Sequence, residues 1–155
     1  MYGFIRKKGL SIIELEKRLM FDASLTGIIT STVIGEDASN AAPAVIDNDV
    51  TISGTTLDFN GESLTVGSTG LAEDDLNIID EGTGAGQIGF NGSIITYEGT
   101  QIGTLASDGQ DGADLVVNFD NTTSQAALER LIENITYQNT SDDPATTKNL
   151  SFSVG

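Results

Sequence analysis

Residues 87–105 have the sequence QIGFNGSIITYEGTQIGTL, in which short apolar and β-branched runs alternate with turn residues. Asn91-Gly92 separates two of these runs, and this dipeptide is a strong hairpin signal because both central positions of a type I′ turn need positive φ. Glu98-Gly99-Thr100 marks a second turn. The stretch therefore predicts three strands, at Gln87–Phe90, Ser93–Tyr97 and Gln101–Leu105, joined by two turns.

The same pattern extends over the rest of the chain from Val45 onward. Turn residues interrupt the apolar runs about every 8 to 12 residues, which is the spacing of a β-sandwich or a β-barrel. A further turn is marked by Asn60-Gly61. The additional predicted strands are Val50–Ser53, Thr56–Phe59, Ser63–Val66, Leu76–Ile79, Leu115–Phe119, Ile135–Gln138 and Asn149–Val154.

One segment has helical rather than strand periodicity. Ser124 is a good N-cap residue, and the apolar residues that follow recur at the spacing of one helix face. These residues are Ala127, Leu128, Leu131 and Ile132. We expect a short crossover helix that covers one end of the sandwich core.

The N-terminal residues differ in composition from the rest. Ser11-Ile12-Ile13-Glu14 fits a capping box, so a short amphipathic helix is expected near residues 12–20. No apolar run approaches the length of about 20 residues that a membrane-spanning helix needs. Residues 27–44 are rich in Ser, Thr, Ala, Gly and Asn and are expected to form a flexible linker, with one strand at Gly27–Ile34.

Charge and composition exclude several classes of function. The formal net charge is −16, with 23 acidic and 7 basic residues, so no nucleic-acid partner is expected. Beyond Arg18 the only basic residues are Arg130 and Lys148. The chain has no cysteine and no histidine, which removes disulfides, thiol chemistry, zinc sites and the most common general base. We therefore expect no enzyme and assign no catalytic or cofactor-binding residue.

Two parts of the sequence resemble one family. Residues 12–25, IIELEKRLMFDASL, resemble the LEPRLMFDAAL-type leader of giant bacterial cell-surface and adhesin-like proteins, with Lys17 where that family usually has proline. Residues 82–105, 127–144 and 150–154 together resemble a repeat of the same proteins, which are built from tandem Ig- or cadherin-like domains and are often of the RTX type.

This resemblance implies an architecture and a role. The expected fold is mainly β, an Ig/cadherin-like β-sandwich over residues 45–155 with one crossover helix, preceded by a leader at 1–26 and the linker at 27–44. In that family a further repeat follows, so truncation of the repeat at Gly155 is expected. The implied function is a structural or adhesive repeat module of a secreted or cell-surface protein. Its partners would be neighbouring repeats of the parent chain and surface or matrix glycans or proteins.

Acidic clusters are the candidate binding sites. Calcium takes six to eight oxygen ligands, and flexible acidic loops at the ends of a sandwich supply them. Asp108, Asp111 and Asp114 are separated by glycine-containing spacers, and Asp47 and Asp49 lie where cadherin-like arrays hold interdomain calcium. These five residues are the predicted metal ligands, with calcium as the expected cofactor and a solvated acidic loop as the alternative. Glu73-Asp74-Asp75 and Asp142-Asp143 form further acidic clusters.

Three other hypotheses arise from the sequence. Gly84–Gly89 matches G-x-G-x-x-G, but a hairpin pattern follows it where a dinucleotide site needs a helix, so a glycine-rich turn is expected. An extracellular polysaccharide-binding or glycan-acting module would need an aromatic cleft. A pilin-like filament subunit would be processed after Gly9, because KKGLSIIELE resembles a type IV prepilin cleavage site.

Overall fold

The structure is a computed structural model of the 155-residue chain. It describes residues 10–19, 24–26, 31–35, 42–54, 57–68, 70–143 and 147–155, with the backbone alone in the first three ranges and at Thr147. The described residues form thirteen strands and the helix α2. The fold is therefore mainly β, as the sequence predicts.

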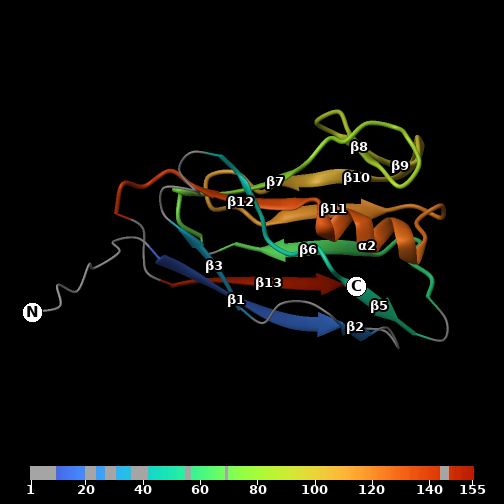
Figure 1. Ribbon diagram of the computed structural model, residues 1–155. Helices are drawn as coiled ribbons and strands as arrows, with labels where there is room; N and C mark the ends of the chain where they lie inside the picture. The colour runs from blue at the N-terminus through green and yellow to red at the C-terminus, as the bar shows by residue number, and fades with distance from the viewer. Residues whose placement is uncertain are drawn as a thin grey trace, which may run out of the picture.

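Eight strands form the larger sheet, which extends across the molecule (Figure 1). Neighbouring strands are antiparallel with one exception, the parallel pair β1 and β13. In spatial order the strands are β3 (Ser31–Gly35), β1 (Leu10–Leu19), β13 (Thr147–Val154), β6 (Ser63–Gly67), β11 (Leu115–Phe119), β10 (Thr100–Asp108), β9 (Ile94–Tyr97) and β8 (Ile88–Phe90).

A smaller antiparallel sheet contributes to the same core. It consists of β4 (Ala44–Val45), β12 (Ile135–Asn139) and β7 (Asp74–Ile78), while β2 (Ser24–Thr26) pairs with β5 (Thr51–Ser53). Buried apolar side chains of both sheets and of α2 form one cluster, which includes Leu76 from β7, Val117 from β11 and Phe152 from β13. Two sheets around a single apolar core form a β-sandwich, which agrees with the predicted fold class.

Helix α2 (Gln125–Glu133) confirms the helical prediction in its position and its buried face. The Ser124 hydroxyl accepts a hydrogen bond from the Ala127 amide at 3.2 Å, as an N-cap residue does. The four predicted apolar residues, Ala127, Leu128, Leu131 and Ile132, are all buried. The helix therefore contributes an apolar face to the sandwich core.

The type I′ geometry that the sequence predicts at Asn91-Gly92 occurs instead at the second turn, Glu98-Gly99. The β9–β10 turn has positive φ at both Glu98 (52°) and Gly99 (80°), which is the type I′ pattern. In the β8–β9 loop only Gly92 has positive φ (90°), and the Asn91 side chain instead accepts hydrogen bonds from the amides of Ser93 and Ile94 at 3.2 and 2.9 Å. The type I′ prediction at Asn91-Gly92 is therefore wrong, because the asparagine side chain closes this loop.

The prediction of a helix near residues 12–20 is also wrong for residues 12–19, which the structure describes. Residues 10–19 form strand β1, which pairs with both β3 and β13. From Ile13 to Leu19 apolar residues at positions 13, 15 and 19 and charged residues at 14, 16 and 18 follow a period of two, which Lys17 interrupts. Pairing along two strand edges prevails here over the local capping signal.

The other predicted strands occur within a few residues of their expected ends, except one. The sequence predicts a strand at Thr56–Phe59, but residues 57–59 lie outside any strand and lead into the turn at Asn60-Gly61. In the expected linker, residues 31–35 form β3. Since β1 pairs with β13 and β2 with β5, parts of the predicted leader join the sheets of the predicted domain.

Candidate functional site

A buried cluster of polar and charged side chains lies between the two sheets at one end of the core. Asp74 begins β7, Tyr137 and Asn139 belong to β12, and Lys148 is the second residue of β13. All four are 0–1% exposed. The β7–β12 register places Asn139 directly opposite Asp74. The cluster thus links the smaller sheet to the larger one.

Strand alternation explains why these charged residues are buried. Asp74 is followed by Leu76 and Ile78 on the inward face of β7, and Lys148 is followed on β13 by Leu150, Phe152 and Val154. Because side chains alternate across a strand, the residue that precedes an inward series at a spacing of two also points inward. Asp74 and Lys148 therefore occupy the first inward position of their strands.

The Lys148 ammonium group contacts two carboxylates. Its Nζ lies 3.0 Å from Asp74 Oδ2 and 3.1 Å from Glu73 Oε1. The Lys148 and Asp74 side chains are 1% and 0% exposed, whereas the Glu73 side chain is 34% exposed. Glu73 therefore lies at the solvent edge of an otherwise enclosed ion cluster.

The second carboxylate oxygen of Asp74 accepts hydrogen bonds from two donors. The Tyr137 hydroxyl and Asn139 Nδ2 each lie 2.6 Å from Asp74 Oδ1. The orientation of the Asn139 amide is fixed because its Oδ1 accepts from the Ser141 amide at 2.9 Å. Burial, and then the hydrogen bond to Asp74, raise the pKa of Tyr137 far above its usual value. Tyr137 therefore remains a hydrogen-bond donor at neutral pH.

Alkaline pH is expected to destabilise the fold through Tyr137. A raised folded-state pKa means that stability is complete below the unfolded pKa, near 10, and falls as pH rises above it. For this single group the loss approaches about 1.4 kcal/mol per pH unit. Urea unfolding between neutral pH and pH ~11 measures the loss, and Tyr137→Phe should be less pH-dependent over this interval. An equal slope in both proteins would contradict the assignment.

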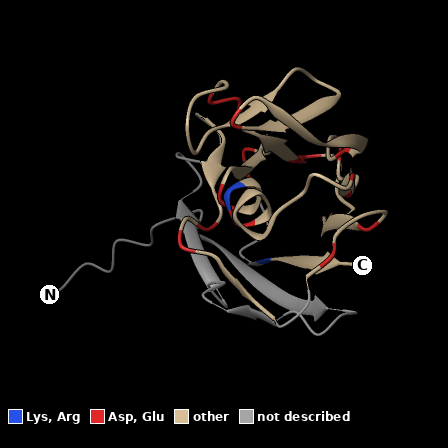
Figure 2. Ribbon diagram, turned by 90° about the vertical axis from the view of Figure 1, so that its right-hand side faces the viewer, with Lys and Arg blue, Asp and Glu red and all other residues tan. Residues whose placement is uncertain are grey.

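A second ion cluster involves Arg130 and is more exposed. Its guanidinium group contacts Glu81, lies 3.3 Å from Glu133 Oε2 and donates from Nε to the Gly86 carbonyl at 3.1 Å. Figure 2 shows the basic segments on α2 and on the strand that leads to the C-terminus, among acidic loops. This cluster attaches α2 to the loop before β8. Its charges stay in contact with solvent, because the Arg130 side chain is 37% exposed.

Two of the three carboxylates predicted to bind calcium in the loop at 108–114 accept hydrogen bonds from separate backbone amides, whereas Asp111 makes its contact through its own amide. Asp108 Oδ1 accepts from the Gln110 amide at 3.2 Å, and Asp114 Oδ1 accepts from the Ser68 amide at 2.9 Å. The Asp111 amide donates to Asp75 Oδ1 at 2.8 Å. In the loop before β5, Asp47 is 2% exposed and accepts from the Asp49 amide at 3.2 Å, while Asp49 is exposed.

Among the residues that the structure describes, no three carboxylates gather into a group that could hold a metal ion. Calcium binding at Asp108, Asp111, Asp114, Asp47 and Asp49 therefore stays a prediction. The glycines of the loop have another role, because the backbone at Gly109 and Gly112 passes close to Leu76 and Leu71.

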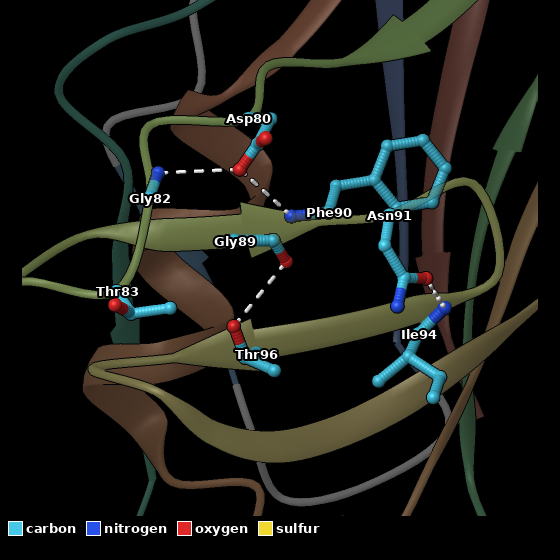
Figure 3. A pocket seen from close by; sticks show the side chains of 8 residues that line it. All are labelled: Asp80, Gly82, Thr83, Gly89, Phe90, Asn91, Ile94 and Thr96. Atoms are coloured by element: carbon cyan, nitrogen blue, oxygen red, sulfur yellow. Dashed lines mark hydrogen bonds between the residues drawn. The ribbon is translucent and has the colours of Figure 1, made fainter.

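The G-x-G-x-x-G segment forms a turn, as expected. The Gln87 amide donates to the Gly84 carbonyl at 3.1 Å, and strand β8 follows instead of a helix. Beside it is an open hollow of about 300 Å³ (Figure 3). Its Asp80 side chain accepts from the amides of Gly82 and Phe90 at 3.2 and 3.1 Å. Phe90 is the aromatic residue in its lining.

Sequence reasoning missed the buried cluster, although the signal for it was present. The sequence pattern groups Asp74 with its acidic neighbours Glu73 and Asp75, and the predicted strand Asn149–Val154 begins one residue after Lys148. The alternation in Asp74-x-Leu76-x-Ile78 and in Lys148-x-Leu150-x-Phe152 would have placed both residues on inward faces. Opposite charges at two inward positions predict an ion pair.

Comparison of the chain with protein-family models, with curated proteins and with solved structures finds no match. Within the part of the chain that the structure describes, no helix has both the length and the apolar character required to cross a membrane.

Proposed function

We propose that the chain is a structural module of a secreted or cell-surface bacterial protein, with an Ig/cadherin-like sandwich that acts as a spacer or in cell adhesion. The sequence resemblance, the mainly β fold and the strongly acidic composition support this proposal. Neighbouring repeats of the same parent chain would be its direct partners, and calcium would add stability at the acidic loops. A spacer has to remain folded when force is applied along the chain.

The proposal rests on the pairing of strand β13 with a neighbour on each of its two edges. It pairs in parallel with β1, from Thr147 opposite Ile12 to Val154 opposite Leu19, and antiparallel with β6 on its other edge. Two parallel strands have their N-terminal ends on the same side. Force applied before β1 and after β13 therefore pulls the strands in opposite directions along their length.

The paired strands resist rupture best when force acts in this direction. Hydrogen bonds between strands lie across the strand direction, so sliding β13 along its neighbours loads many of them together. Peeling one strand away from another would instead break its bonds one after another. Lys148 adds a further attachment, because its ion pair with Asp74 connects β13 to the smaller sheet.

Single-molecule force spectroscopy tests the proposal. With handles at the two ends of the chain, we expect a high unfolding force, because rupture under load depends on the unfolding barrier. The control applies force between cysteines introduced at Ile94 and Thr104, paired residues at the open end of the β9–β10 hairpin. The chain has no cysteine of its own, so both attachments are unique.

The control direction peels strands apart, so it should rupture at a clearly lower force. Equal forces in the two directions, or a weaker response between the ends, would remove the mechanical basis for a spacer.

A further inference from the structure

The buried cluster has the composition of a reaction site as well as that of an ion pair. An amine and a carboxyl group are held 3.0 Å apart, on side chains that are 1% and 0% exposed. Glu73 Oε1, within 3.1 Å of the same amine, is placed to accept a proton from it. Two donors, Tyr137 and Asn139, converge on the one oxygen of Asp74 that does not contact the amine.

We propose that Lys148 and Asp74 condense within the folded chain to form an isopeptide bond, with Glu73 as the group that moves the protons. The Lys148 nitrogen forms a bond to Asp74 Cγ, and the bond between Cγ and Oδ2 breaks. The nitrogen loses two protons in all, and Oδ2 takes up two and leaves as water. Glu73 transfers these protons and ends in its starting state, so no oxidant or other reactant is required.

The hydrogen bonds of the cluster suit the intermediate of this reaction. Attack on Cγ places negative charge on Oδ1, which already accepts from Tyr137 and Asn139. Donors fixed in advance at the oxygen where charge develops are the common means of stabilising such an intermediate. Holding the two reacting groups together supplies the further advantage of an intramolecular reaction.

Burial also favours the product. An ion pair enclosed in an apolar core bears the desolvation cost of both charges, whereas an amide is neutral. The partly exposed Glu73 side chain lies at the edge of the cluster, where released water reaches solvent.

The Arg130 cluster lacks both a nucleophilic amine and a buried environment. Its guanidinium group stays protonated in proteins and is not a nucleophile, and its side chain is 37% exposed. It therefore provides an internal comparison of an ion pair that cannot form the bond.

Intact-mass spectrometry of the purified full chain, denatured before analysis, is the primary test. We expect a mass lower than the sequence mass by one water molecule, and a proteolytic fragment in which the peptides containing Asp74 and Lys148 are joined. A mass equal to that of the sequence, or a water loss that maps elsewhere, overturns the proposal. The result does not depend on the folding of any variant, and it is independent of the force measurement that tests the proposed function.

Succinimide formation gives the same mass change as an isopeptide bond, but the two products can be distinguished. Asp108-Gly109 and Asp111-Gly112 can cyclise to succinimides, which also lose one water. Mild alkali opens a succinimide and restores the mass, whereas an isopeptide bond survives it. A mass deficit that disappears in alkali counts against the proposal.

Two variants test the assigned roles. Glu73→Gln is expected to retain the unmodified mass or to lose water much more slowly, while Glu81→Gln in the Arg130 cluster should lose water as the native chain does. Masses are compared with that of each variant's own sequence, and circular dichroism establishes that both are folded. Equal water loss in the two variants would show that Glu73 does not move the protons.

Discussion

Replacing Lys148 with methionine is expected to lower the free energy of unfolding by about 3–5 kcal/mol, because it leaves the carboxylate of Asp74 buried without its cation. Asp74 is 0% exposed, and the donors Tyr137 and Asn139 beside its carboxylate carry no positive charge. Methionine matches much of the lysine volume, so the lost charge, rather than a cavity, dominates the effect. If Lys148 and Asp74 are covalently joined, the loss is larger still.

Guanidinium unfolding of the full chain measures this loss, and Arg130→Met is the matched control. Arg130 also contacts two carboxylates, but its side chain is 37% exposed, and exposed ion pairs contribute only about 0–1 kcal/mol. Adding Asp74→Asn to the Lys148→Met protein should recover part of the stability, because the remaining group is then neutral. A Lys148→Met protein as stable as Arg130→Met would show that the buried pair is not what holds these strands.

Replacing Gly112 with alanine is expected to cost about 2–5 kcal/mol, from backbone strain and from overpacking together. The residue has a φ of 79°, which favours glycine. An added Cβ would lie 2.5 Å from the Leu71 carbonyl oxygen and 2.6 Å from two other backbone atoms of Leu71. Backbone cannot rotate away as a side chain can, so the loop itself would have to move.

Gly61→Ala separates the two contributions. Gly61 has nearly the same φ, 81°, but nothing lies within 4 Å of its added Cβ. This variant should lose only about 1–2 kcal/mol, from the left-handed backbone alone. Thermal and denaturant unfolding of both proteins gives the difference. Similar losses would mean that close contact with Leu71 contributes little, and that conformational strain accounts for both results.

Local patterns in the sequence were enough to place much of the sandwich. Strand β11 has the predicted ends, Leu115 and Phe119, and α2 has the predicted cap and buried face. Both elements have a clear periodicity and strong turn or capping residues at their ends. In such segments the local preference and the tertiary structure agree, and the sequence is then informative.

Contacts between distant residues could not be predicted in the same way. Strand β1 forms because residues 10–19 meet β13 and β3, and the local capping pattern around Ser11 favours a helix instead. The Lys148–Asp74 pair joins residues that are 74 positions apart. Alternation places each residue on an inward face, but only the relative position of the two sheets brings the charges together.

The place of β13 in the larger sheet also has a consequence for the order in which the chain folds. Among the described strands it comes last in sequence, yet it lies between β1 and β6 in the interior of the sheet. Until it docks, both of these neighbours have an unpaired edge, which is a hazard for aggregation. Such long-range pairing makes folding slow, on the millisecond to second scale. The sheet is therefore expected to close late, only once residues 147–154 are free to enter it.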